Sequence, residues 1–143
     1  MKFLLDTNVF REIGKTEPNR NVAAWLATVD DREHAISVLA VREVGKGVAR
    51  LRTGKRDVAD RIERRVREIF EAFGERILPV TQEIAALWGE LLAHADKHVD
   101  DTGLAATARA HGLILVTRNL KHVAGRGVAA LDPFKSVPRI GRP

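Results

Sequence analysis

The chain has 143 residues, with 24 Lys and Arg against 19 Asp and Glu, so its formal net charge is +5. Its length suits a single domain, and its 45% of hydrophobic residues can build a core, which excludes a disordered chain or a disulfide-stapled miniprotein. Because cysteine is absent, a disulfide framework, a cysteine nucleophile and a Cys-type zinc or iron–sulfur site are excluded as well.

Two short apolar runs near the start of the chain predict buried strands. The first run, 3–5, ends at Asp6 and is far too short for a signal sequence or a membrane span, so we expect a cytoplasmic protein without a membrane partner. Hydrophobic residues then recur at helical spacing over 22–29. The second run, 34–36, leads into Ser37, a residue type that caps helices.

Two amphipathic helices are expected after Ser37. The first has its apolar positions between Val41 and Leu51 and ends at 53–55. The second carries hydrophobic residues from Ile62 to Phe73 on one side and most of the arginines on the other, with Gly74 as its terminator. Each helix should bury one face and expose a charged one.

The second half of the chain continues the alternation of strands and helices. We expect strands over 77–80, 113–116 and 128–131, a helix over 84–95 capped by Thr81, and a small-residue helix that follows Asp101 and closes at Gly112. Pro79 gives the first of these strands an edge position. The pattern implies a three-layer α/β/α domain over 1–143, with a central parallel sheet of four to five strands and a basic tail from about residue 132.

Positive charge is concentrated in two segments. Residues 42–67 hold ten basic and four acidic side chains, +6, and residues 118–143 hold six basic and one acidic, +5. Since the whole chain totals +5, the remainder carries −6. A basic band beside an acidic remainder is typical of a phosphate-binding protein with a carboxylate site, although a solvated, arginine-rich helix face has the same composition.

Acidic and polar residues cluster near the expected strand ends. In open parallel sheets, ligands bind outside the carboxyl ends of the strands, where strand order reverses. The candidates at such positions are Asp6, Glu43, Asp100, Asp101, Thr117 and Asn119. Each acid taken alone has a plainer role as a helix cap or an ion-pair partner, so the functional argument depends on their convergence.

Converging carboxylates repel each other unless a cation lies among them. Mg²⁺ or Mn²⁺ suits oxygen ligands better than zinc here, because cysteine is absent and no histidine is among the candidates. Such an ion activates water and offsets the charge that develops on a phosphodiester under attack. We therefore predict hydrolysis of a nucleic-acid backbone.

Four motifs occur in order along the chain. They are Leu-Leu-Asp-Thr-Asn-Val-Phe over 4–10, Ser-Val-Leu-Ala-Val-Arg-Glu-Val-Gly-Lys-Gly over 37–47, Asp-Thr-Gly-Leu-Ala-Ala-Thr-Ala over 101–108, and Leu-Val-Thr-Arg-Asn over 115–119. In order and spacing they resemble the PIN-domain toxins of the VapC type, and 77–80 is similar to that family's third strand. The resemblance implies a PIN-like fold and a Mg²⁺- or Mn²⁺-dependent endoribonuclease, the toxin of a type II toxin–antitoxin pair.

The resemblance also implies a role for each site residue. By position the catalytic set is Asp6, Glu43, Asp101 and Asn119, with Asp6, Glu43 and Asp101 as metal ligands and with Thr7, Asn8, Asp100 and Thr117 as supporting polar residues. Asp101 is preferred to Asp100 as the primary ligand because of its place before the Ala-Ala-Thr-Ala run. The hydroxyls of Thr7 and Thr117 are expected to bond carboxylates or water.

One departure from the family's pattern concerns a fourth acid. Many relatives place it at the position of Asn119 or three residues later, where this chain has His122. The site then has a formal charge of −3 from three carboxylates, which favours one well-held metal ion, and Asn119 can still hydrogen-bond to water. The alternative function is a PIN-like RNA- or partner-binding module that is catalytically weak.

The resemblance implies partners as well as a substrate. Relatives cut different RNAs, tRNA among them, and each toxin is held inactive by a VapB-like antitoxin that alone contacts operator DNA. We expect a homodimer within a larger toxin–antitoxin complex. Apolar stripes around Val22, Val44 and Val48 are the expected contact surface.

Other interpretations have weaker support. A receiver-like domain needs an acid pair after the first strand and an aspartyl phosphatase needs Asp-x-Asp, but 6–8 read Asp-Thr-Asn. His94 and His98 have the i,i+4 spacing of a zinc pair on one helix, yet no third ligand is evident, so surface histidines are expected. Trp25 and Trp88 lie on apolar helix faces and are expected in the core.

Overall fold

A computed structural model describes residues 1–135 and 140–141, and within them six strands form one sheet. The strands are β1 (Phe3–Leu5), β2 (His34–Ser37), β3 (Ile77–Leu78), β4 (Ile114–Val116), β5 (Ala130–Leu131) and β6 (Ile140–Gly141), in the order β3-β2-β1-β4-β5-β6. The first five are parallel, which confirms the predicted parallel sheet, and β6 is antiparallel to β5. The sequence did not predict β6, which lies in the expected basic tail. β3 is at the edge, as predicted, and Pro79 follows it.

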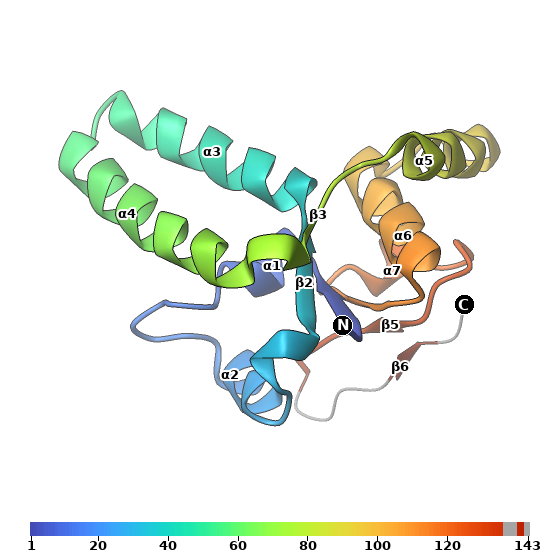
Figure 1. Cartoon of the computed structure of the whole chain (residues 1–143), viewed down its shortest axis with the longest axis horizontal. Helices are drawn as coiled ribbons and strands as arrows, with labels where there is room; N and C mark the ends of the chain where they lie inside the picture. The colour runs from blue at the N-terminus through green and yellow to red at the C-terminus, as the bar shows by residue number, and fades with distance from the viewer. Residues whose placement is uncertain (136–139, 142–143) are drawn as a thin grey trace.

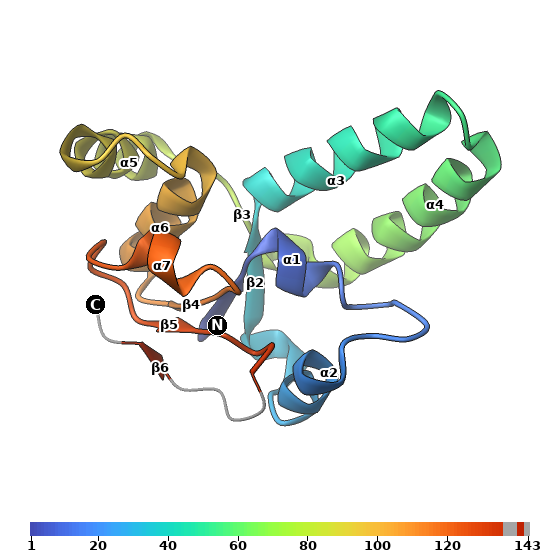
Figure 2. The same ribbon diagram turned by 180° about the vertical axis from the view of Figure 1, so that it is seen from behind.

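Helices cover both sides of the sheet. They are α1 (Thr7–Phe10), α2 (Arg20–Ala27), α3 (Val38–Arg52), α4 (Arg56–Phe73), α5 (Gln82–His94), α6 (Val99–His111) and α7 (Leu120–Val123), with short 3-10 turns at Asp31–Glu33 and Gly74–Arg76. In Figures 1 and 2, α3 and α4 form a hairpin that extends away from the sheet, whereas α5, α6 and α7 lie on its other side. This is the expected α/β/α arrangement.

Side-chain caps fix where three helices begin. Ser37 Oγ accepts a hydrogen bond from the backbone N–H of Leu39 at 3.0 Å, and Thr81 Oγ1 accepts one from Ile84 at 3.2 Å, as predicted. Asp6 caps α1 in the same way. Because these caps follow β1, β2 and β3 closely, the helices start at the carboxyl edge of the sheet.

Alternation along β1 divides the core into two clusters. Leu4 points to the face covered by α6, where the small side chains of Ala105 and Ala108 let the helix approach the sheet. Phe3 and Leu5 point to the opposite face, covered by α1 to α4. Burial of both faces is typical of a parallel sheet and explains why its strands are continuous apolar runs.

Both tryptophans are partly buried and pack against the core, in agreement with the prediction that they serve packing. Trp25 meets Phe3 edge-on, with ring centroids 5.1 Å apart. Trp88 packs so closely on α6 that a Cβ added at Gly103 would lie 2.7 Å from its ring. Glycine at this position therefore lets α5 and α6 come together.

Three sequence predictions were wrong in detail. α6 begins at Val99, so Asp101 lies in its first turn and not before it. His94 ends α5 and His98 precedes α6, so the two histidines do not share a helix. Val22 and Val48 are both buried and are not part of an exposed stripe, since the sheet covers the apolar face of α2; of the three valines only Val44 is partly exposed. No helix among the described residues is long and apolar enough to cross a membrane.

Candidate active site

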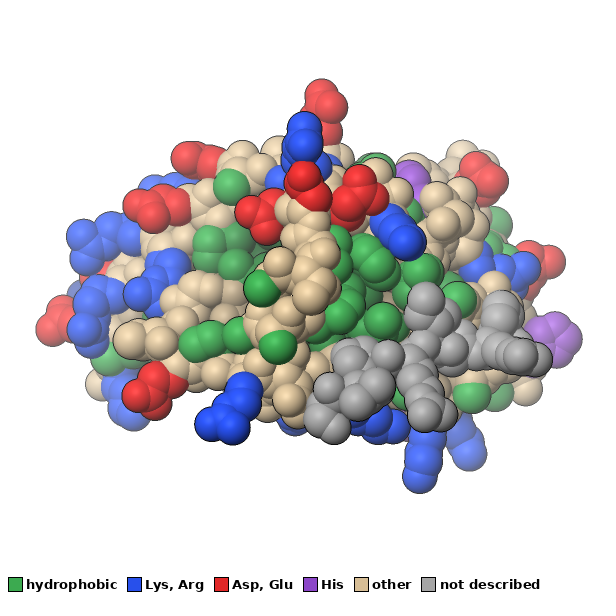
Figure 3. Space-filling view, turned by 90° about the horizontal axis from the view of Figure 1, so that it is seen from below, with side chains coloured by type: hydrophobic (Ala, Val, Ile, Leu, Met, Phe, Trp, Pro, Cys, Tyr) green, Lys and Arg blue, Asp and Glu red, His purple; other side chains and the backbone are tan. Residues whose placement is uncertain are grey.

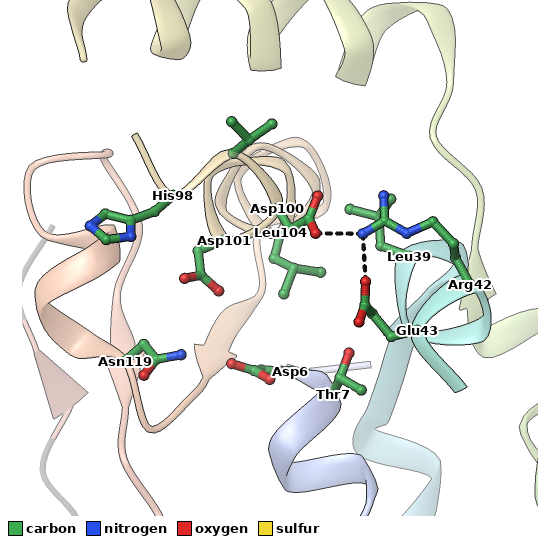
Figure 4. Close-up of a pocket in the computed structure, with 11 residues that line it drawn as sticks. Asp6, Thr7, Leu39, Arg42, Glu43, His98, Asp100, Asp101, Leu104 and Asn119 are labelled. Carbon is green, nitrogen blue, oxygen red and sulfur yellow. Dashed lines mark hydrogen bonds and ion pairs between the residues drawn. The ribbon is translucent and has the colours of Figure 1, made fainter. Parts of the chain in front are cut away.

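A cavity of about 390 Å³ opens at the carboxyl end of the sheet, where the strand order reverses between β1 and β4. Its walls come from the segment after β1, the first turns of α3 and α6, and the segment after β4. Figure 4 shows the carboxylates of Asp6, Glu43 and Asp101 directed toward this space from different elements. These three carboxylates, which are separated by 37 to 95 positions in the sequence, thus meet at one place.

Asp6 is the most firmly held of these carboxylates. It is only 4% exposed, and both of its oxygens accept hydrogen bonds: Oδ1 from the backbone N–H of Asn8 at 2.7 Å and Oδ2 from the hydroxyl of Thr117 at 2.5 Å. Burial raises the pKa of Asp6 above its ordinary value, the two hydrogen bonds oppose this rise, and nearby Asp101 adds to it. A buried acid beside a second acid is a place that a cation would stabilise.

Thr117 and Asn119 extend this network from the end of β4. The buried Thr117 hydroxyl donates to Asp6 and accepts the backbone N–H of Asn119 at 3.0 Å. The side-chain amide of Asn119 lines the cavity, as does Thr7. Asn8 contributes its backbone N–H, while its side chain is exposed and does not line the cavity.

The two adjacent acids of α6 lie in different surroundings. Asp100 is exposed and pairs with the guanidinium of Arg42 at 2.5 Å. The same guanidinium nitrogen lies 2.9 Å from Glu43, and these contacts, first with Asp100 and then with Glu43, raise the pKa of Arg42. Asp101 is partly buried and close enough to Asp6 to influence its pKa. The geometry therefore favours Asp101 over Asp100 as the partner of Asp6.

Two histidines that were not among the predicted site residues lie beside Asp101. His122 Nδ1 lies 2.8 Å from Asp101 Oδ2, and His98 lines the cavity. The sequence contained a signal for His98, which is three residues before Asp101 and so can lie next to it across a helix start. That signal was missed because His98 was paired with His94.

The donor set fits a hard divalent cation. Asp6, Glu43 and Asp101 provide carboxylate oxygens at one cavity, the type of ligand that Mg²⁺ and Mn²⁺ prefer. The raised pKa of the buried Asp6 is a second indication, because a nearby positive charge would favour its ionised form. These residues can hold such an ion, with Asn119 and Thr7 able to bond to its waters.

A second feature is an apolar groove between α3 and α4. It measures about 590 Å³ and includes Val44, Val48 and Phe70, with Arg52 and Arg67 among the charged residues beside them. Arg52 pairs with Asp60 and with Glu63, and Arg67 pairs with Glu63 at 3.3 Å, so part of the basic band is neutralised within the hairpin. Figure 3 shows basic side chains at the hairpin end interspersed with acidic ones on that face.

The fold and the acidic cavity define a class. Residues 3–124 match the family model described as the PIN domain, and the chain belongs to this family. Within it, the chain is 34% identical over 138 residues to Toxin FitB of Neisseria gonorrhoeae, covering 92% of this chain and 97% of that protein. It is 31% identical over 139 residues to VapC ribonuclease Y4jK of Sinorhizobium fredii, covering 92% and 97%.

Solved structures give the same result. The crystal structure of FitAcB from Neisseria gonorrhoeae is similar with a TM-score of 0.81 and 33% identity, covering 92% of this chain and 98% of that one. A toxin–antitoxin complex from Klebsiella pneumoniae is similar with a TM-score of 0.68 and 25% identity, covering 92% and 98%. This chain is thus a PIN domain of the VapC and FitB toxin type.

Proposed function

We propose that this chain is a divalent-cation-dependent endoribonuclease, the toxic member of a type II toxin–antitoxin pair. The observation that supports this most directly is the convergence of Asp6, Glu43 and Asp101 on one cavity. The similarity to proteins named as a toxin and as a VapC ribonuclease supports the same class.

In this proposal the three carboxylates hold Mg²⁺ or Mn²⁺ with a formal charge of −3. When bound, the cation lowers the pKa of a water molecule and offsets charge on the phosphate. Asn8 and Thr117 keep the Asp6 carboxylate in one orientation through their hydrogen bonds. The amide of Asn119 can hydrogen-bond to the water or to a phosphate oxygen at the edge of the cavity.

Arg42 gives the cavity a means of receiving RNA. Its guanidinium is about half exposed and lies at the carboxylates of Glu43 and Asp100. A phosphate entering the cavity can replace Asp100 as its partner, because guanidinium binds phosphate and carboxylate oxygens in the same way. The basic residues of α3 and α4 extend the positive field beyond the cavity, and a structured RNA such as tRNA is a candidate substrate.

The groove between α3 and α4 is the proposed docking site for a VapB-like antitoxin. The partly exposed Val44 and Phe70 provide apolar contacts, and the neighbouring arginines suit a partner segment with acidic residues. The similarity to a toxin–antitoxin complex from Klebsiella pneumoniae supports an antitoxin as the partner. We further propose a homodimer, and contact with operator DNA through the antitoxin alone. Val44→Asp should reduce co-purification with the product of a small adjacent upstream gene, whereas unchanged co-purification would exclude the groove.

The catalytic proposal is tested with purified full-length chain, structured RNA and Mg²⁺ or Mn²⁺. Asp6→Asn should abolish cleavage, as should EDTA. Asp30→Asn is the matched control, because Asp30 also caps a helical turn but is exposed outside the cavity. Cleavage that survives Asp6→Asn would overturn the assignment of the site.

A catalytically weak RNA-binding module is the second candidate. It is favoured by one observation: the chain has an amide at Asn119 and an imidazole at His122, the two positions at one of which the family resemblance implies a fourth acid. Retained RNA binding without cleavage of any RNA, with either metal, would support this candidate over the nuclease.

A further inference from the structure

Three potential metal ligands gather at one end of the cavity. His98 directly precedes α6, Asp101 lies in the first turn of α6, and His122 lies on α7. One ligand atom from each lies within 4.8 Å of the other two. Figure 4 places His98 and Asp101 on the side of the cavity away from Glu43, so this cluster is spatially offset from the carboxylate that α3 provides.

The two imidazole rings are already arranged side by side. Their centroids are 3.6 Å apart and their planes differ by 7°. Two imidazole nitrogens that share a tetrahedral ion at about 2.0–2.1 Å lie roughly 3.3 Å from each other. Stacked parallel rings do not direct their nitrogens at one point, because a metal ion lies in the plane of each imidazole that binds it. One ring must therefore turn out of the stack when the ion binds, and His98 is the exposed one of the two.

The contact between His122 and Asp101 suits the same ion. His122 Nδ1 and Asp101 Oδ2 share a hydrogen bond of 2.8 Å. An imidazole nitrogen and a carboxylate oxygen are both metal-ligand atoms, so an ion can take the place of this direct contact. Because His98 is exposed, an ion can reach the cluster from solvent.

The backbone at His98 is unusual within the described part of the chain. His98 has φ +50°, and it is the only residue other than glycine with positive φ in the described part of the chain. Left-handed backbone is uncommon for side chains other than Asn, Asp and His, and it concentrates at functional sites.

We propose that His98, Asp101 and His122 form a second cation site, which prefers a transition metal of the zinc class to Mg²⁺. Two imidazoles and one carboxylate are typical ligands of Zn²⁺, Co²⁺ and Ni²⁺, whereas Mg²⁺ favours oxygen ligands and water. Three protein ligands leave at least one position for water or for RNA. The site shares Asp101 with the proposed nuclease centre, but its ability to bind metal does not depend on RNA cleavage.

The test is a Co²⁺ titration of the untagged full-length chain in excess Mg²⁺, followed by visible absorption and then displacement by Zn²⁺. The wild type should bind one Co²⁺ per chain with intense bands of a nitrogen-ligated, low-coordinate ion. His98→Ala should weaken binding by at least about 100-fold and remove the bands, because a direct ligand contributes no less than the outer contacts of metal sites. His122→Ala should weaken Co²⁺ binding and remove the absorption bands in the same way.

Two further variants separate this site from its surroundings. His94→Ala removes another exposed histidine, which ends α5, and should leave the titration unchanged. Asp6→Asn should abolish RNA cleavage yet retain Co²⁺ binding, so a failed nuclease assignment is distinguishable from a failed second site. The proposal is overturned if the wild type shows no saturable binding or if His98→Ala binds Co²⁺ like the wild type. Loss of binding in His122→Ala but not in His98→Ala would also overturn it, because the two histidines would then not share one ion.

Discussion

The acidic cavity and the α3–α4 hairpin carry opposite charges and are assembled in different ways. The carboxylates of the cavity come from separate elements and are brought together by the strand order of the sheet. The hairpin's charges come from one continuous segment, 42–67, and part of them pair with each other. Local sequence composition thus describes the hairpin well, whereas the cavity exists only in the folded chain.

The largest expected effect is the difference in RNA cleavage between substitutions of two adjacent acids at the cavity. Asp101→Asn should lower RNA cleavage by at least about 1,000-fold, since losing a cation ligand removes several kcal/mol of transition-state stabilisation. Asp100→Asn should lower it less than roughly 10-fold, because Asp100 is an exposed partner of Arg42. Single-turnover cleavage rates measure both, and equal losses would show that the two acids share the role.

Thr117→Val should have the next largest effect. It removes the hydroxyl that holds Asp6 while keeping the side-chain shape, and cleavage should fall by about 10- to 100-fold, the range typical of residues that orient metal ligands. Thr28→Val is the control, because the exposed Thr28 hydroxyl bonds only within its own turn, to the Trp25 carbonyl. Rates measured across Mg²⁺ concentrations should show a higher Mg²⁺ requirement for Thr117→Val. An unchanged cleavage rate and Mg²⁺ requirement in Thr117→Val would mean that burial alone orients Asp6.

Substitutions on the hairpin should act on RNA affinity and not on chemistry. The double variant Arg50→Gln, Arg64→Gln removes two exposed charges and should weaken RNA binding by a few fold at low salt. The slope of log affinity against log salt should fall by about 1.4, at roughly 0.7 for each phosphate contact of a single strand. Arg32→Gln, outside the hairpin, is the control. A slope identical to the wild type would exclude the hairpin as the RNA track.

The smallest effect concerns stability without metal. Because burial raises the pKa of Asp6 above 3.8, the folded state binds the proton of this carboxyl group more tightly than the unfolded state does. The stability of the folded chain therefore falls as the pH rises from 3.8 through the raised pKa of Asp6. In EDTA at neutral pH, Asp6→Asn should therefore raise the melting temperature, because burial penalises the charged carboxylate and not the neutral amide. The gain should vanish below pH 3.8 and shrink when Mg²⁺ is added.

The sequence predicted those features that depend on short-range patterns. Asp6 and Thr117 end apolar runs, so the carboxyl edge of the sheet could be located, and Ser37 and Thr81 were recognised as caps. The contact between His122 and Asp101 spans 21 residues and depends on how α6 and α7 pack, which no local pattern records. Val22 was assigned to a surface because periodicity identifies an apolar face without showing what covers it.

β6 and the role of Arg42 were missed for related reasons. β6 has only two residues and gains its strand character from pairing with β5, not from its own composition. Arg42 was counted with the basic band, yet its position at the start of α3 places it between two cavity carboxylates. In both cases tertiary contacts decide the outcome.

The central claim is that Asp6, Glu43 and Asp101 together hold a divalent cation. Isothermal titration calorimetry of Mg²⁺ into the full-length chain tests it most directly, with Asp6→Asn and Glu43→Gln beside the wild type. We predict saturable binding of Mg²⁺ by the wild type and a loss of affinity of at least about 10-fold in each variant. Equal Mg²⁺ affinity in all three proteins would contradict the claim.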